Sequence, residues 1–233
     1  MTQHVAITGL LAIGMTLVIL TGGIDLSVGA VAGICGMVAG ALLTNGVPLW
    51  GGNTLFFNVP EVILVVALFG IVLGLINGTV VTRLGVAPFI CTLGMMYVAR
   101  GAALLFNDGS TYANLVGMPA LGNTGFALLG SGSVLGVYIP IWLMIGFLLL
   151  GLYLTRKTPL GRYIYATGGN ESAARLAGVP IIKVKVFVYA FSGLCAALVG
   201  LIVASQLQNR APDDRQHVRD GRHRCNRIGT ERR

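Results

Sequence analysis

The residues G-R-Y-I-Y-A-T-G-G-N-E-S-A-A-R-L-A-G, from Gly161 to Gly178, are the one well-formed polar segment between two long apolar runs. The run before this segment extends from Tyr138 to Thr155, and the run after it extends from Val184 to Leu207. Each run is long and apolar enough to cross a bilayer core of about 30 Å as a helix. The segment therefore predicts a chain that enters a membrane on both sides of it.

The distribution of charge predicts which side of the membrane this segment occupies. Residues 156–185 contain six Lys or Arg residues and a single acid, Glu171. Loops rich in Lys and Arg lie on the cytoplasmic side of membranes. We therefore call residues 156–183 the basic loop and expect it to be cytoplasmic. The same rule places Arg83 inside, and it places the loops 44–60 and 107–133, which have no Lys or Arg, outside.

A short helix is predicted within the basic loop. Gly168 and Gly169 are expected to interrupt the structure before it, and Asn170 is a good N-cap residue. Glu171 suits the positive end of the helix dipole, and Gly178 suits the left-handed position after the last turn. A helix of about seven residues is marginal in water and needs something to pack against. The residues leave open whether this is an ordinary capped turn or a contact surface for a partner.

The composition is that of a polytopic membrane protein. Hydrophobic residues make up 55% of the chain and charged residues 10%, and the mean hydropathy is +0.82. A soluble protein has about 25% charged residues. The net charge of +8 is concentrated in the basic loop and after residue 212, so it reports membrane sidedness and not nucleic-acid binding. The four cysteines have no C-x-x-C spacing, and we predict buried thiols and no metal site.

Six apolar runs predict an all-α, polytopic transmembrane bundle. These runs are His4–Leu20, Leu26–Leu43, Glu61–Val81, Val86–Phe106, Tyr138–Thr155 and Val184–Leu207. In the second run, the pairs Gly29 and Gly33, and Gly36 and Gly40, have the small-x-x-x-small spacing that lets helices approach closely. The orientation places Met1 outside without a signal sequence, so we expect that a preceding span is missing from this chain.

An acidic residue lies between the first two runs, in T-G-G-I-D-L-S-V-G, Thr21 to Gly29. Gly22 and Gly23 are expected to break the helix there. Asp25 has two compatible interpretations. It can cap a helix that starts at Leu26, or the broken segment can mark a transport pathway, because irregular backbone at membrane depth needs protein or a water-filled cavity around it.

Three separated segments resemble one family of transport proteins. They are V-I-L-T-G-G-I-D-L-S-V-G at Val18–Gly29, G-L-I-N-G-T-V-V-T-R-L-G-V-A-P-F-I-C-T-L-G at Gly74–Gly94, and Gly161–Val179. The segments occur in the same order in the ribose, xylose and allose type of bacterial ABC-transporter permeases. The resemblance extends from Val5 to about Pro212.

This resemblance implies a multi-pass subunit of the bacterial inner membrane. Its expected partners are a second permease copy, two cytoplasmic ABC ATPase subunits and a periplasmic sugar-binding protein. The chain has no G-x-x-x-x-G-K-[ST] loop, so we expect no enzymatic activity and no bound cofactor, with ATP on the ATPase. The short helix is similar to the coupling helix that docks on the ATPase. The implied coupling residues are Arg162, Gly168, Gly169, Asn170, Glu171, Ala174, Arg175, Leu176 and Gly178.

The pathway for such a cargo calls for hydroxyl and amide groups, because a sugar is neutral and rich in hydroxyls. The candidates by residue type and by the broken segment are Gly22, Gly23, Asp25, Ser27, Asn77 and Thr92. A different class stays open, an ion-coupled secondary transporter or channel in which Asp25 and Arg100 are the intramembrane charges. A membrane-embedded enzyme is disfavoured, because the apolar runs hold no paired carboxylates and no H-E-x-x-H motif.

The chain departs from the family after Pro212. Residues 1–212 are expected to form an incomplete permease domain, and 213–233 form a charged, Arg-rich tail. The tail can be read as a solvated segment that binds anionic lipid. A frameshift explains it better, because one permissible codon choice for Asp213–Gly229, read from its second base, encodes T-T-G-N-M-Y-E-M-D-A-I-A-A-I-V-L, similar to the family's continuation. We therefore expect a chain truncated at both ends.

Overall fold

The computed structural model describes residues 2–48, 54–55, 57–106, 109–110, 112, 125–134 and 136–208. Its helices are α1 Thr2–Leu20, α2 Val28–Thr44, α3 Val59–Arg83, α4 Pro88–Leu105, α5 Ala127–Ser131, α6 Ile139–Lys157, α7 Pro159–Gly169, α8 Glu171–Leu176 and α9 Ile181–Gln208. Two antiparallel pairs of two-residue strands accompany them, β1 Val47–Pro48 with β2 Thr54–Leu55, and β3 Ser133–Val134 with β4 Val137–Tyr138. The predicted all-α bundle is confirmed. The tail 213–233 lies outside the described residues.

All six predicted spans form helices, namely α1, α2, α3, α4, α6 and α9. By length and composition, α3, α4, α6 and α9 are able to cross a membrane. The apolar segments His4–Leu20 and Val28–Thr44 are shorter. Helix α2 starts at Val28, two residues later than predicted, for a reason that lies in the contacts of Asp25 described below.

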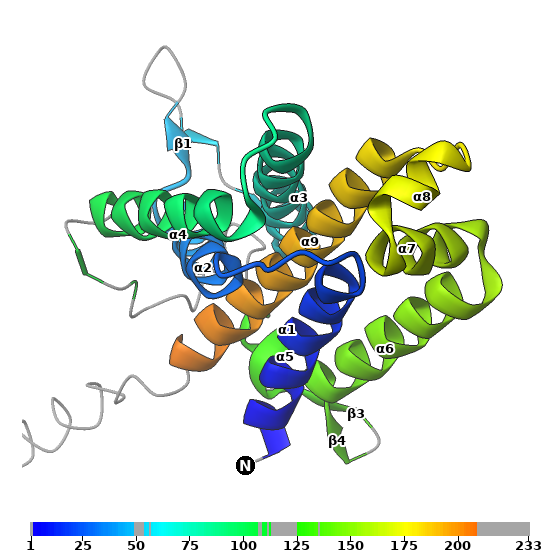
Figure 1. Cartoon of the computed structure of the whole chain (residues 1–233). Helices are drawn as coiled ribbons and strands as arrows, with labels where there is room; N and C mark the ends of the chain where they lie inside the picture. The colour runs from blue at the N-terminus through cyan, green and yellow to red at the C-terminus, as the bar shows by residue number, and fades with distance from the viewer. Residues whose placement is uncertain are drawn as a thin grey trace, which may run out of the picture.

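Helix α9 is the centre of the bundle (Figure 1). It packs against α1, α2, α3 and α5. In its most apolar part 67% of the residues are buried, compared with 11% in α4 and in α6. A helix that is apolar on all sides is expected to be enclosed by other helices. Helices α4 and α6 instead turn large apolar side chains outward, as helices that face lipid do.

Glycines in α3 let its backbone touch the backbone of α9. Gly70, Gly74 and Gly78 recur every fourth residue and so lie on one face of α3. A Cβ atom on Gly78 would lie 2.8 Å from the Cα of Val186, and one on Gly74 would overlap the carbonyl oxygen of Tyr189. This seam is the membrane form of close packing through small residues.

Of the four glycines in the small-residue patterns predicted in α2, only Gly36 lies close to the backbone of another helix. A Cβ atom on Gly36 would lie 3.2 Å from the carbonyl oxygen of Gly200 in α9, so this glycine does serve helix contact. Gly40 faces the ring of Tyr112. A Cβ atom on Gly29 or Gly33 would meet no atom of another helix within 4 Å, and both glycines line a cavity instead. Spacing alone does not distinguish a helix contact from a cavity wall.

We expect Gly74→Ala to destabilise the bundle. The added methyl group must push α3 away from the Tyr189 carbonyl, and such overpacking costs about 1–3 kcal/mol. Gly146→Ala is the matched control, because Gly146 in α6 has open space where its Cβ would lie. The control should keep or slightly raise stability, since Ala favours helix by about 1 kcal/mol over Gly. Thermal unfolding midpoints in detergent measure both variants, and equal midpoints would contradict the seam.

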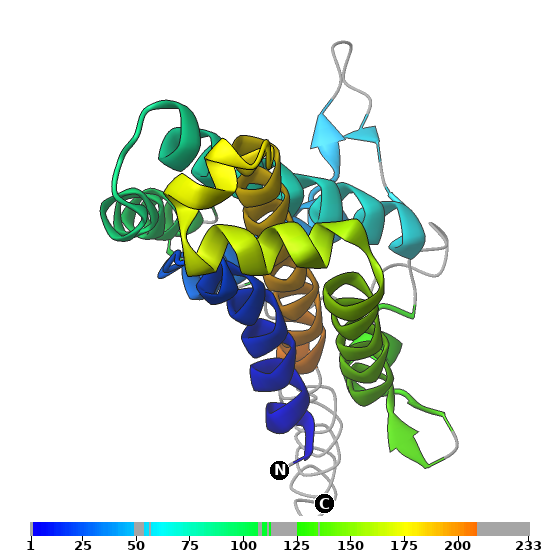
Figure 2. The same ribbon diagram turned by 45° about the vertical axis from the view of Figure 1, so that its right-hand side comes forward.

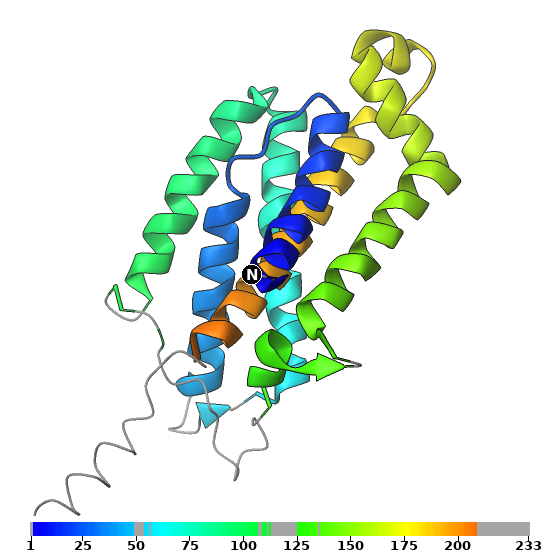
Figure 3. The same cartoon turned by 90° about the horizontal axis from the view of Figure 1, so that it is seen from below.

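The long helices run roughly side by side and give the bundle two distinct ends (Figure 3). One end carries α7, α8, the turn between α3 and α4, and the break between α1 and α2. The opposite end carries both strand pairs and α5. This arrangement agrees with the predicted alternation, in which the basic loop and Arg83 share one side. Helix α7 lies across the bundle at that end, in contact with α1, α6 and α9 (Figure 2).

Candidate functional site

The basic loop contains two helices, and the predicted break falls at Asn170, directly after Gly168 and Gly169 and not at the glycines themselves. Helix α7 includes both glycines and ends at Gly169, and the next residue, Asn170, is extended with a φ of −153°. A Cβ atom on Gly168 would overlap the carbonyl oxygen of Leu20, the last residue of α1. Gly161 is equally close to the carbonyl oxygen of Thr155 in α6. Glycine at positions 161 and 168 permits close packing of α7.

A signal for α7 was present in the sequence. Pro159 follows Thr158 at the first turn, a position that proline favours. Gly161, Ile164 and Thr167 are buried and recur at intervals of three residues, which places them on one helix face. Arg162 lies on the exposed side of the same helix.

Helix α8 has the predicted ends. The Oδ1 of Asn170 accepts a hydrogen bond of 3.0 Å from the backbone N–H of Ala173. Gly178 adopts φ +80°, its N–H donates to the carbonyl of Arg175 at 3.1 Å, and the N–H of Val179 donates to the carbonyl of Ala174 at 3.0 Å. These two bonds form a Schellman motif. Both ends of a six-residue helix are thus fixed by hydrogen bonds.

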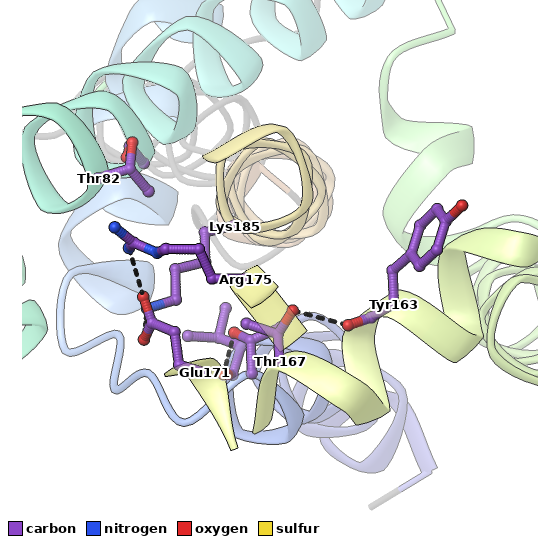
Figure 4. A network of polar contacts seen from close by, with 9 residues as sticks. Thr82, Tyr163, Thr167, Glu171, Arg175 and Lys185 are labelled. Atoms are coloured by element: carbon purple, nitrogen blue, oxygen red, sulfur yellow. Dashed lines mark hydrogen bonds and ion pairs between the residues drawn. The ribbon is translucent and has the colours of Figure 1, made fainter. Parts of the chain in front are cut away.

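An ion pair attaches α8 to the central helix (Figure 4). Glu171 lies 2.7 Å from the Nζ of Lys185 in α9, whose side chain is only 15% exposed, and 3.6 Å from Arg175. Ala174 is buried against the bundle, whereas Leu176 is 91% exposed. Helix α8 therefore sits on a fixed base and presents Arg175 and Leu176 to the outside.

A second cluster forms at the break between α1 and α2. Asp25 is buried, and its Oδ1 accepts hydrogen bonds from the N–H of Ser27 at 3.0 Å and from its Oγ at 2.6 Å. Its Oδ2 accepts a bond of 2.9 Å from the Oγ of Ser192 in α9. Because Asp25 binds the Ser27 N–H in an Asx turn, helix α2 begins only at Val28. The predicted start at Leu26 is therefore wrong.

Side chains from α3 and α4 complete this cluster. The Nδ2 of Asn77 donates to the Oγ of Ser27 at 3.0 Å. The Oγ1 of Thr92 donates to the Ile24 carbonyl at 3.3 Å and to the Pro88 carbonyl at 2.9 Å. We call the buried set the polar junction, and it consists of Asp25, Ser27, Asn77, Thr92 and Ser192. Four of the six predicted pathway residues thus lie together, and their role in transport stays a prediction.

The two remaining pathway candidates shape the break. Gly22 has φ +74°, a conformation that glycine adopts without strain. The N–H groups of Gly22 and Gly23 donate to the carbonyls of Ile19 and Val18 at 2.9 and 3.0 Å and close the end of α1. A Cβ atom on Gly23 would lie 2.8 Å from the hydroxyl of Tyr189. Both glycines are therefore needed by local geometry.

Two polar residues of α9 lie near the break and were not predicted from the sequence. Ser192 binds Asp25, and the fully buried Tyr189 places its hydroxyl beside Gly23. They lie three residues apart, hence on one face of α9, within a stretch from Val186 to Ala204 that is otherwise apolar. That spacing was the available signal. The cysteines behave as predicted at Cys35 and Cys195, which are buried and free, while Cys91 is partly buried.

A cavity of about 460 Å³ lies along α2, on the side of the break that faces away from α7 and α8. Gly29, Gly33 and Gly36 form one wall, α9 forms another, and Arg100 of α4 lines it. The six predicted pathway residues do not line this cavity. Along α2, the polar junction therefore lies between the cavity and the end that carries α7 and α8.

The sequence matches the protein family described as "Branched-chain amino acid transport system / permease component" over residues 2–218. The chain belongs to this permease family. Its curated relatives include sugar permeases, so the resemblance stated above is confirmed. Like them, this permease is a multi-pass protein of the bacterial inner membrane.

Three relatives show the extent of the likeness. The ribose import permease of Haemophilus influenzae is 40% identical over 217 residues, which cover 90% of this chain and 61% of that protein. The galactofuranose transporter permease of Escherichia coli K12 is 41% identical over 206 residues, covering 88% and 55%. The L-arabinose permease of the same strain is 34% identical over 208 residues, covering 89% and 58%. The chain thus spans about three fifths of the length of these relatives. No solved structure matches it.

Proposed function

We propose that this chain forms part of the translocation pathway of an ATP-driven sugar importer. The relatives named for ribose, galactofuranose and L-arabinose transport support a pentose or hexose cargo. The observation that carries the coupling role is α8, a short helix fixed at both ends that leaves Leu176 91% exposed. A helix of six residues needs something to pack against, and one that is fixed at both ends and presents an exposed apolar side chain suits a groove in a protein partner.

The proposed partners are those of an ABC importer. A cytoplasmic ATPase binds ATP and receives α8, and a periplasmic protein delivers the sugar. A second permease copy completes the pathway. The chain itself carries no catalytic group in this scheme, and ATP is bound and hydrolysed by the ATPase subunit.

The described contacts give the proposed motion a route. Movement of α8 reaches α9 through the Glu171–Lys185 ion pair, and α9 holds Asp25 through Ser192. Helix α7 also presses directly on the end of α1 through Gly168. In the alternating-access mechanism, these links open the polar junction when the ATPases change state. The sugar hydroxyls then replace the hydrogen bonds that Ser27, Asn77 and Thr92 make with one another and with the backbone.

We test the coupling role with Leu176→Asp and co-purification with the ATPase subunit of the same importer. A charge at the centre of an apolar contact is costly to bury, so binding should fall about tenfold or more. Leu84→Asp is the matched control, because Leu84 is 72% exposed and directly follows α3, in the turn at the same end of the bundle, but lies outside the basic loop. Unchanged binding by Leu176→Asp would reject the assignment. Uptake that needs an ion gradient and no ATPase would favour the ion-coupled alternative.

A further inference from the structure

Helix α6 ends at the end of the bundle that carries α7 and α8 (Figure 3), and its last turn carries Arg156 and Lys157. Most of the large apolar side chains of α6 are exposed, Trp142 and Leu150 among them, and five of the exposed ones are spaced three or four residues apart along one side of the helix. We call this set the α6 stripe, and its members are Ile145, Leu148, Leu149, Leu152 and Tyr153. Arg156 and Lys157 are exposed and continue the same spacing. The apolar surface therefore leads directly into two cationic side chains.

Helix α7 adds a third cation beside two aromatic residues. The chain turns at Pro159, and Arg162 follows on the exposed side of α7. Tyr163 and Tyr165 are 38% and 53% exposed, and Tyr163 points away from α8 and α9 (Figure 4). Tyrosine is enriched where hydrocarbon meets water. We call Arg156, Lys157 and Arg162 the α6 basic end.

No acidic side chain in the described residues pairs with the α6 basic end. Asp25 is buried in the polar junction. Glu61 caps α3 at the other end of the bundle, where its Oε2 accepts a bond of 2.9 Å from the N–H of Asn58. Glu171 is taken by Lys185 and Arg175. Three cations thus face the surroundings at the level where a membrane helix ends.

We propose that the α6 basic end binds the phosphate of an anionic phospholipid whose acyl chains lie along the α6 stripe. Charge complementarity selects the headgroup, because basic side chains at the cytoplasmic end of a membrane helix attract anionic lipid. The stripe selects a lipid over a soluble acidic partner, which would contact the charges but have no use for the apolar surface beyond them. The inference depends on membrane insertion and not on the proposed transport function.

The test is native mass spectrometry of the purified chain in micelles that contain equal amounts of phosphatidylglycerol and phosphatidylcholine. The wild-type chain should retain phosphatidylglycerol in preference. The variant R156Q/K157Q/R162Q should lose about tenfold or more of this preference. The variant R83Q/R175Q/K183Q removes the same charge at the same end of the bundle but away from the stripe, and it should bind like wild type.

A charge-preserving variant distinguishes loss of charge from loss of the fold. R156K/R162K should keep the preference for phosphatidylglycerol, since the cations remain. A wild-type chain without preference would overturn the proposal, as would equal losses in the two triple-Gln variants. If R156Q/K157Q/R162Q bound phosphatidylglycerol normally but failed to bind the ATPase, the α6 basic end would serve a protein partner and the proposal would be wrong.

Discussion

Deleting residues 170–178 will uncouple ATP hydrolysis from sugar transport and leave the chain in the membrane. The deletion removes α8 with its exposed Leu176 and cuts the Glu171–Lys185 link to α9, while the six long helices and their glycine seams remain. We expect the sugar imported per ATP hydrolysed to fall by about tenfold or more, because without α8 the proposed contact that couples the ATPase to the pathway is lost. The measurement is uptake and ATPase activity of the assembled importer in proteoliposomes.

A pair of milder variants keeps the loop at full length and so tests the α8 helix by itself. Asn170→Ala removes the N-cap acceptor and should destabilise α8 by about 1 kcal/mol, whereas Asn170→Asp keeps an oxygen that can accept from Ala173. The Ala variant should therefore transport less than the Asp variant. Normal transport by the deletion mutant would reject the coupling role of α8.

The ends of α8 were predictable because capping is local. Asn170 and Gly178 act on backbone groups within four residues, so the sequence itself contains both partners of each hydrogen bond. Gly168 shows where this reasoning stops. A glycine either ends a helix or lets another backbone approach, and the choice here depends on Leu20, which lies far away in the chain. Tertiary contact therefore decided the length of α7.

Residue type predicted the members of the polar junction that come from the break, α3 and α4, but not the member that comes from α9. Asp25, Ser27, Asn77 and Thr92 stood out as polar groups near a broken segment or in apolar runs. Ser192 did not, because its only mark in the sequence is its spacing of three residues from Tyr189 within a long apolar run, and nothing local to α9 points to Asp25, which lies far away in the chain. Sequence periodicity identifies a face only when the opposite face is polar.

Asp25→Leu should prevent the chain from accumulating as a folded protein. The carboxylate accepts three hydrogen bonds, from the N–H and Oγ of Ser27 and from the Oγ of Ser192, and all three groups are buried. Each donor left without an acceptor costs about 1–3 kcal/mol, so the total approaches the stability of an ordinary domain. Size-exclusion chromatography in detergent should show the monodisperse fraction falling about tenfold or more. A normal elution profile would mean that the junction does not hold the break.

Asp25→Asn decides what the carboxylate contributes beyond these bonds. The amide oxygen can accept from the N–H and Oγ of Ser27 as the Oδ1 of Asp25 does. The amide nitrogen takes the place of Oδ2, so it donates to the Oγ of Ser192 where Oδ2 accepted from it. We expect this variant to fold with a loss of about 1–2 kcal/mol, because bonds to a neutral acceptor are weaker than those to a charged one. If Asp25 positions the break for a neutral sugar, ATP-driven uptake should persist in the Asn variant. Uptake that disappears while the elution profile and unfolding midpoint stay near wild type would show that the negative charge itself is used, as in an ion-coupled transporter.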